Sequence, residues 1–117
     1  MANTFKLTTN AGLTTSLVDQ YTTPSSTTAI IVGMSISNTS ANSITTDVTI
    51  VSTTSDNRRS GVTNETVHLV KSAPVPSGSS LEIMSGNKIV LETGDKIQAL
   101  ASTTGVADIL ISYMEIT

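Results

Sequence analysis

The residues that could carry out chemistry are few in this sequence, and their spacing does not form a catalytic motif. His68 is the only histidine, and it lies in the stretch ETVHLVK. A hydrolase of the triad type needs a serine nucleophile held by an oriented base, and the many serines of this chain include no G-x-S-x-G elbow. We therefore interpret His68 as a solvent or interface residue and predict that the chain is not an enzyme.

Metal-binding patterns are equally sparse. The acidic residues include no D-x-[DN]-x-[DN]-G run of the kind that forms a calcium loop, which leaves Glu92 and Asp95 as the pair from which a site could be assembled. The stretches VPSGSSLEI and IVLETGDKI resemble part of a cupin jelly roll. A cupin metal site needs several histidines and a carboxylate, so the sequence, with one histidine and no cysteine, predicts neither a metal nor a cofactor.

The charge distribution limits the partners that we expect. The formal net charge is −3, and Arg58 and Arg59 are the one adjacent basic pair, so we predict no binding to nucleic acid. This pair lies in the polar stretch TTSDNRRSG at 53–61, which is typical of a protruding loop. Its arginines form either a solvated loop tip or a contact with an acidic patch on a partner subunit. The sequence contains no apolar run of membrane-spanning length and no signal-peptide core, so we expect no membrane association and synthesis in the cytoplasm.

The elements that must position these residues are predicted to be strands. Apolar and polar residues alternate with a period of two from end to end, which is typical of strands with one buried face. Turn signals at Gly86-Asn87, Thr93-Gly94-Asp95 and Thr104-Gly105 supply the positive φ angles of tight turns. The pattern predicts strands near residues 4–8, 13–22, 28–37, 44–53, 64–71, 80–84, 88–92, 96–102 and 106–116.

These signals favour an all-β fold, an antiparallel and jelly-roll-like β-sandwich of about eight to nine short strands. We expect it to form a single domain over residues 1–117. We expect the core to contain Ile30, Val32, Met34, Val48, Ile50, Leu69, Leu81, Ile83, Ile89, Leu91, Ile97 and Ile109. Pro74 and Pro76 remove backbone donors, so APVPSGSS cannot be a central strand. We predict that this segment crosses between the sheets and that a three-strand meander follows it.

The last predicted strand, in ADILISYMEI, is apolar on both faces. Ile109, Ile111 and Tyr113 alternate with Leu110, Met114 and Ile116, whereas a sandwich buries one face of each strand. The second face needs a cover, either another strand of the chain or a neighbouring copy. The stretch NTFKLTT adds Phe5 and Leu7 near a chain end, where order usually requires docking. The candidate subunit contacts are therefore Phe5, Leu7, Arg58, Arg59, Leu110, Ile111, Tyr113, Met114 and Ile116.

Four segments that span nearly the whole chain carry a family resemblance. They are MANTFKLTTNAGLTT, TTAIIVGMSISNTSANSITTDVTI, PVPSGSSLEIMSGNKIVLETGDKIQA and DILISYMEIT. Together they resemble a family of small virion structural proteins of tailed bacteriophages, best represented in phages of cyanobacteria and other aquatic bacteria. These motifs are strand and turn phrases rather than catalytic signatures. The resemblance implies a β-sandwich module that acts by packing, in multiple copies, on a capsid, neck or tail.

The expected function is therefore that of a non-enzymatic virion structural protein. Capsid decoration or cementing is the first choice, and a neck, collar or tail component is the alternative. A host-binding adhesin or lectin-like module comes third, because it would need Tyr21 or Tyr113 on an open surface and the chain has few aromatic residues. The resemblance implies other virion proteins and further copies of this chain as partners, and the virion as the final location.

Overall fold

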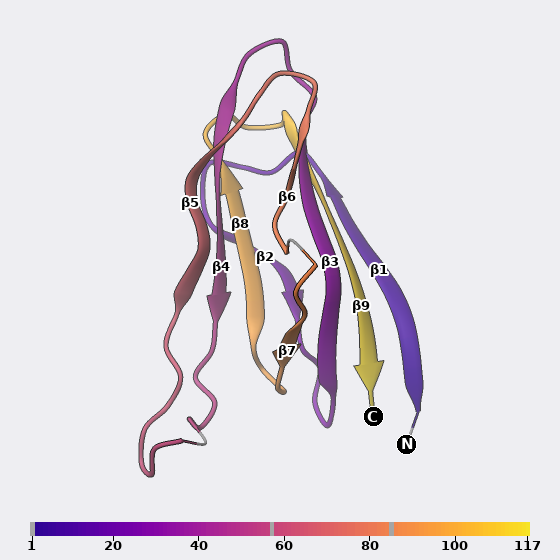
Figure 1. The fold of residues 1–117 in the computed structure, drawn as a ribbon, viewed down its shortest axis with the longest axis vertical. Helices are drawn as coiled ribbons and strands as arrows, with labels where there is room; N and C mark the ends of the chain where they lie inside the picture. The colour runs from indigo at the N-terminus through magenta and orange to yellow at the C-terminus, as the bar shows by residue number, and fades with distance from the viewer. Residues whose placement is uncertain (1, 57, 85) are drawn as a thin grey trace.

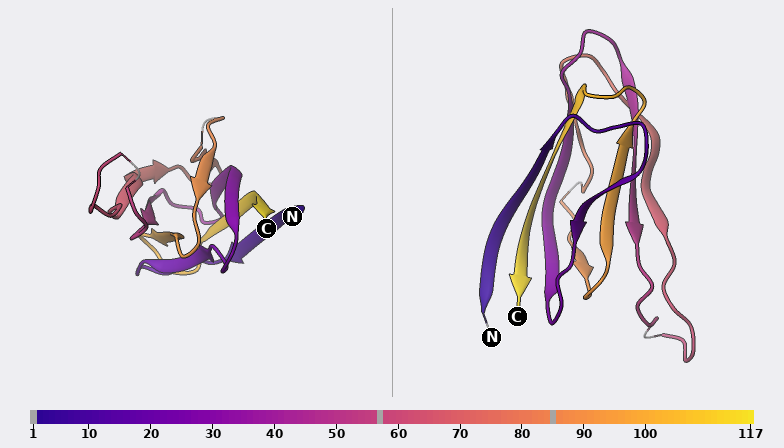
Figure 2. Two further views of the ribbon diagram at one scale, coloured as in Figure 1. Left: turned by 90° about the horizontal axis from the view of Figure 1, so that it is seen from below. Right: turned by 180° about the vertical axis from the view of Figure 1, so that it is seen from behind.

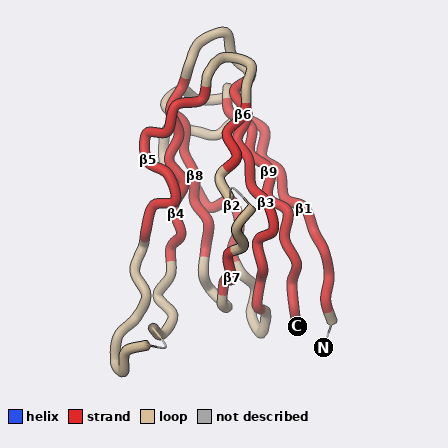
Figure 3. The backbone as a smooth tube through the Cα atoms, in the orientation of Figure 1, coloured by secondary structure: helices blue, strands red, loops and turns tan. Residues whose placement is uncertain are grey.

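Strands form all the regular structure in the computed structural model, which describes residues 2–56, 58–84 and 86–117 (Figure 1). Within these residues there are nine strands and no helix, so nothing in them could cross a membrane as a helix. The strands are β1 (Asn3–Ala11), β2 (Val18–Thr22), β3 (Thr28–Asn38), β4 (Ile44–Val51), β5 (Val67–Val75), β6 (Ser80–Glu82), β7 (Ile89–Leu91), β8 (Lys96–Ala101) and β9 (Ala107–Ile116). Loops gather at the two ends of the strands (Figure 3).

The strands are arranged in two antiparallel sheets that pack face to face (Figure 2). One sheet has the order β1-β9-β3-β6, with β7 also paired to β3, and the other has the order β2-β8-β4-β5. Every pairing between named strands is antiparallel. The predicted all-β antiparallel sandwich is therefore confirmed.

The core lies between the two sheets and is aliphatic. Six of the predicted core residues are buried, namely Met34, Val48, Ile50, Leu91, Ile97 and Ile109. Four more pack against the core while partly buried, namely Leu69, Leu81, Ile83 and Ile89. Because both sheets contribute inward-pointing aliphatic side chains along their length, these side chains fill the core without any large aromatic cluster.

The prediction that Ile30 and Val32 belong to the core is wrong, and a β-bulge is the reason. The register of β3 against β9 shifts between Ile31 and Gly33, which leaves Val32 as an extra residue. A bulge of this kind moves the inward side from one parity to the other. Ile31 is buried before the bulge and Met34 after it, whereas Val32 is 39% exposed.

The proline segment crosses between the sheets as predicted. Pro74 is still paired with Thr45 at the end of β5, and β5 is an edge strand, where a missing N–H costs no ladder hydrogen bond. The chain then passes from β5 in one sheet to β6 in the other.

The prediction of a meander after this crossing is wrong. β6 and β7 both pair with β3, at Ser35–Ser37 and at Ala29–Ile31 respectively, so they form one interrupted edge strand. β8 lies in the opposite sheet. The turn at Gly94, whose φ is 91°, therefore connects the two sheets instead of closing a hairpin. Alternation and turn residues are the same in both cases, so the sequence pattern could not separate them.

Candidate assembly surface

An apolar row crosses the outer side of the five-stranded sheet. Residues directly opposite each other on antiparallel strands point to the same face. Phe5 of β1 is opposite Met114 of β9, Met114 is opposite Ile30 of β3, and Ile30 is opposite Val90 of β7. One line of apolar side chains therefore runs from edge to edge of the sheet.

Further apolar residues lie beside this row and complete what we call the apolar face. Its members are Phe5, Leu7, Ile30, Val32, Val90, Leu110, Met114 and Ile116. Phe5 is 76% exposed, Leu7 63% and Val90 61%. Monomeric proteins rarely leave apolar side chains of this size exposed in one continuous patch. The apolar face is thus the feature of the molecule that most needs a partner.

The structure divides the subunit contacts predicted on β9 into residues on the apolar face and residues in the core. Leu110, Met114 and Ile116 join Phe5 and Leu7 on the apolar face. Ile111 and Tyr113 point into the core, with exposures of 0% and 7%, so their prediction as subunit contacts is wrong. The sequence showed two apolar faces on this strand but contained no signal for which one the second sheet covers.

The inner side of β1 is polar, which reverses the usual arrangement. The Lys6 Nζ donates to the Glu115 Oε1 at 2.7 Å, and the Tyr21 hydroxyl donates to the Glu115 Oε2 at 2.7 Å. The Tyr113 hydroxyl lies 3.2 Å from the Thr8 hydroxyl oxygen. Because Tyr21 belongs to β2, the Glu115 carboxylate joins the edge strand β1 to the opposite sheet.

These contacts set the charge state of the cluster. The hydrogen bond from Lys6 and then that from Tyr21 lower the pKa of Glu115, and the same carboxylate raises the pKa of Lys6. Burial, followed by the hydrogen bond to Glu115, raises the pKa of Tyr21. The carboxylate is therefore ionised at neutral pH and holds β1 in place through charge-assisted hydrogen bonds. Sequence reasoning missed this cluster, although Glu115 shares the inward parity of Ile111 and Tyr113 on β9.

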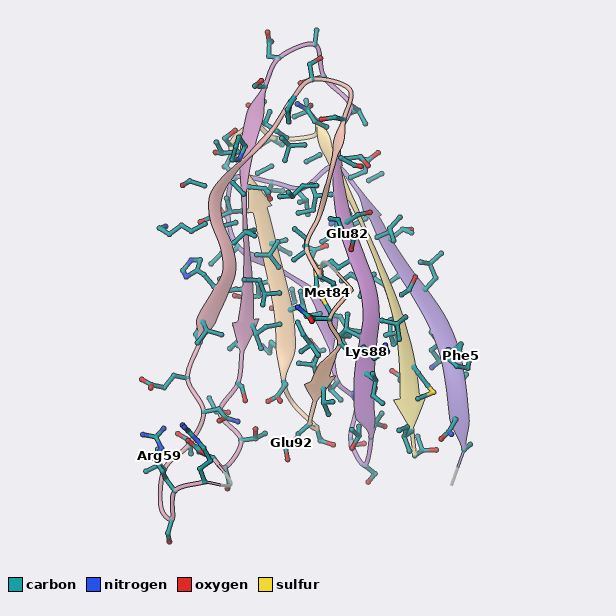
Figure 4. The ribbon with its side chains drawn as sticks, in the orientation of Figure 1. Phe5, Arg59, Glu82, Met84, Lys88 and Glu92 are labelled. Atoms are coloured by element: carbon teal, nitrogen blue, oxygen red, sulfur yellow. The ribbon has the colours of Figure 1, made fainter. Side chains whose placement is uncertain are left out.

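The two arginines of the loop after β4 bind an acidic residue of their own loop. Arg59 Nη2 and Arg58 Nη2 lie 2.7 and 3.2 Å from the Asp56 Oδ2. The hydrogen bonds from Arg58, followed by that from Arg59, lower the pKa of Asp56 to about 2. Figure 4 shows Arg59 at this loop, on the opposite side of the molecule from Phe5. The arginines brace the loop and lie apart from the apolar face, and their contact with an acidic partner stays a prediction.

The residues considered for chemistry do not converge. His68 is exposed on β5. The Asp95 carboxylate accepts hydrogen bonds from the Ser52 hydroxyl at 2.7 Å and from the Glu92 backbone N–H at 3.0 Å, so it closes the turn before β8. In the portions of the chain that the structure covers, no three histidine, cysteine or acidic side chains are grouped as metal ligands.

Comparison with known proteins identifies a fold neighbour. No protein-family model matches the chain, and no curated protein matches it. The chain is similar to one in a solved structure from work in which Bacillus endospore appendages form a novel family of disulfide-linked pili. The two share 16% identity with a TM-score of 0.51, over 99% of this chain and 87% of that one. At this identity the similarity establishes the fold alone, and it agrees with the two-sheet architecture.

Proposed function

We propose that this chain is a non-enzymatic structural subunit of a tailed-bacteriophage virion, and that it decorates or cements the capsid in multiple copies. The observation that carries the proposal is the apolar face. Phe5, Leu7 and Val90 are each more than half exposed on one side of one sheet. Contact with another protein surface would remove this apolar area from water at about 25 cal/mol per Å².

The fold neighbour supports the class of function. Its protein belongs to a pilus, and a pilus is built from repeated subunits. The present chain has no cysteine, so it has no thiols for the disulfide links named for those pili. An assembly of this chain would depend on packing, which the apolar face provides.

The choice of a virion, and of the capsid within it, depends on the sequence resemblance. A neck, collar or tail component is the alternative, since the same apolar face would serve there. The adhesin or lectin-like module is less favoured. Tyr21 and Tyr113 are 8% and 7% exposed, with ring centroids 4.4 Å apart inside the sandwich, and are therefore not an open stacking platform for sugars.

Immunogold electron microscopy and mass spectrometry of purified particles test this proposal. Label spread over the whole capsid, at a copy number comparable with that of the capsid protein, is the expected result. Label confined to the neck, collar or tail would replace capsid decoration by the alternative. Absence of the chain from particles that otherwise contain every structural protein would refute a virion role.

A further inference from the structure

The outer side of the five-stranded sheet is nearly free of charge. Of the outward-pointing residues on the five strands, all within the described ranges, Asp108 of β9 and Glu82 of β6 are the charged ones, and neither belongs to the apolar face. The chain as a whole carries a net charge of −3, so most surfaces of two copies repel each other. The residues of the apolar face carry no charge, so they do not add to this repulsion. It also has no charge pattern that would select a strongly acidic or basic partner, so its charge suits a second copy of the same chain.

A hollow lies on the same outer side, further along β1 and β9 from Phe5. It has a volume of about 240 Å³ and is lined mainly by small side chains around Leu110. The outward-facing lining residues are Thr9, Ala11, Ser35, Ser37, Asp108 and Leu110. An apolar cavity of about 150 Å³ holds a benzene molecule, so the hollow is large enough for a phenyl ring.

The positions of Phe5 and the hollow fit a twofold axis. Phe5 is opposite Met114, and Thr9 is opposite Leu110, so the two levels are four residues or roughly 14 Å apart along the strands. A twofold axis between the two levels, near the Leu7 and Ser112 pair, would place the Phe5 of each copy over the hollow of the other. The same face would then contribute both the Phe5 ring and the hollow that holds it, as a twofold interface requires.

The area of this face suits a moderate interface. β9 contains 10 residues, a length of about 34 Å, and four strand positions at about 4.8 Å spacing give a face on the order of 600 Å². Specific interfaces bury about 800 Å² per partner, and weak ones about 600 Å² or less. The face therefore suffices for a dimer that forms at moderate protein concentration.

We infer that two copies of this chain pair through their apolar faces about a twofold axis, with the Phe5 ring of each copy in the other's hollow beside Leu110. This inference deepens the proposed function, because it names a second copy as the occupant of the face that the proposed function depends on.

Photo-crosslinking of the purified chain tests this arrangement directly. Benzoyl-phenylalanine in place of Phe5 keeps an aromatic side chain at this position, and irradiation should join it to residues 9–11, 35–37 or 108–110 of a second copy. Isotope-labelled and unlabelled chains, mixed before irradiation, identify crosslinks between copies. Crosslinks to the loop around Arg58 would overturn the twofold pairing, as would crosslinks within one copy only.

A cysteine at position 112 provides a second test, because the native chain has no cysteine. Ser112→Cys lies near the proposed axis, where facing sheets are about 10 Å apart. A short bis-maleimide should therefore join two copies at this position. Ser16→Cys, on the exposed segment between β1 and β2, is the control and should stay uncrosslinked. Equal crosslinking at both positions would refute the inference.

Sedimentation analysis with a matched pair of substitutions measures the energetics. Leu110→Ser and Leu17→Ser alter leucines that are both 41% exposed, but only Leu110 lies on the apolar face. Each change occurs twice in a symmetric dimer, so Leu110→Ser should weaken dimerisation by about 100-fold. Phe5→Ala should do the same, and Leu17→Ser should change it by less than about threefold. Unchanged dimerisation in Leu110→Ser and Phe5→Ala, with intact folding, would exclude the pairing.

The outcomes of these experiments can be distinguished from the outcome of the test of the proposed function. If the chain is found in virions but the crosslinks are absent, the face contacts another virion protein and the inference is wrong. If the purified chain pairs as described but is absent from virions, the inference holds and the virion role is wrong.

Discussion

Two neighbouring residues of β9 should respond to truncation very differently. Ile111 is 0% exposed in the core, whereas Leu110 is 41% exposed on the apolar face. The two residues are adjacent in the same strand and both are aliphatic, so their side-chain size and their preference for strands are nearly matched. The variants Ile111→Ala and Leu110→Ala therefore compare the two faces of a single strand.

The expected magnitudes follow from burial. Ile111→Ala removes about three buried carbon groups at about 0.8 kcal/mol each, and the cavity left between two packed sheets adds about 1 kcal/mol or more. The total loss in free energy of unfolding is about 3.5 kcal/mol, a large part of the roughly 5–15 kcal/mol typical of a domain. Leu110→Ala should cost about 1 kcal/mol in the monomer, because much of its side chain already contacts water.

Urea denaturation provides the assay, at protein concentrations low enough to keep the chain monomeric. With an m-value of about 2 kcal/mol per molar urea, Ile111→Ala should lower the midpoint by nearly 2 M, and Leu110→Ala by about 0.5 M. The m-values must agree between variants for this comparison. Equal midpoints, or a larger loss in Leu110→Ala, would show that the faces of β9 are assigned the wrong way round.

Two further predictions concern the polar cluster and a close backbone approach. Because hydrogen bonds lower the pKa of Glu115 below 4.5, its stabilising contribution is present above that pH and is lost as pH falls through its lower folded pKa. Urea titrations across this range should therefore show a flatter acid dependence for Glu115→Gln than for the native chain, and parallel curves would contradict this. Gly12→Ala should lower the melting temperature more than Gly78→Ala. Both glycines have positive φ, but a Cβ at Gly12 would lie 3.3 Å from the Gly105 Cα, whereas one at Gly78 meets nothing within 4 Å, so equal shifts would refute the close approach.

Strand positions could be predicted from the sequence because they depend on local signals. All nine predicted strands have an observed counterpart within the described residues, since period-two alternation and glycine turns are properties of short segments. The proline crossing was predictable for the same reason, because the missing N–H donors of Pro74 and Pro76 exclude a central strand whatever lies around them.

The features that could not be predicted depend on contacts between distant segments. Nothing near Val32 in the sequence separates a bulge from a regular strand, because the bulge is defined by the pairing of β3 with β9. Similarly, the pairing of β6 and β7 with the same strand depends on the position of β3, some 50 residues earlier. The candidate surface was therefore predicted only in part. Phe5, Leu7 and the outer residues of β9 were found, but Val90 was not, since it joins them only through this pairing.

The register of β1 against β9 determines that Phe5 and Leu7 point to the outer side of the sheet. A slip of one residue against β9 would turn every side chain of β1 to the other face. Phe5 and Leu7 would then take inner positions such as those of Lys6 and Thr8, where the Lys6 side chain is 47% exposed and Thr8 is half-buried, so they would lose only part of their contact with water. The slip would also separate Lys6 from Glu115, and it would leave that carboxylate inside the sandwich without its cation. The contacts of Lys6 and Thr8 therefore hold β1 in the register that keeps Phe5 and Leu7 in water. The observed register thus depends on these polar contacts, and its result is that Phe5 and Leu7 lie together on the outer side of the sheet, where a second protein surface can cover both.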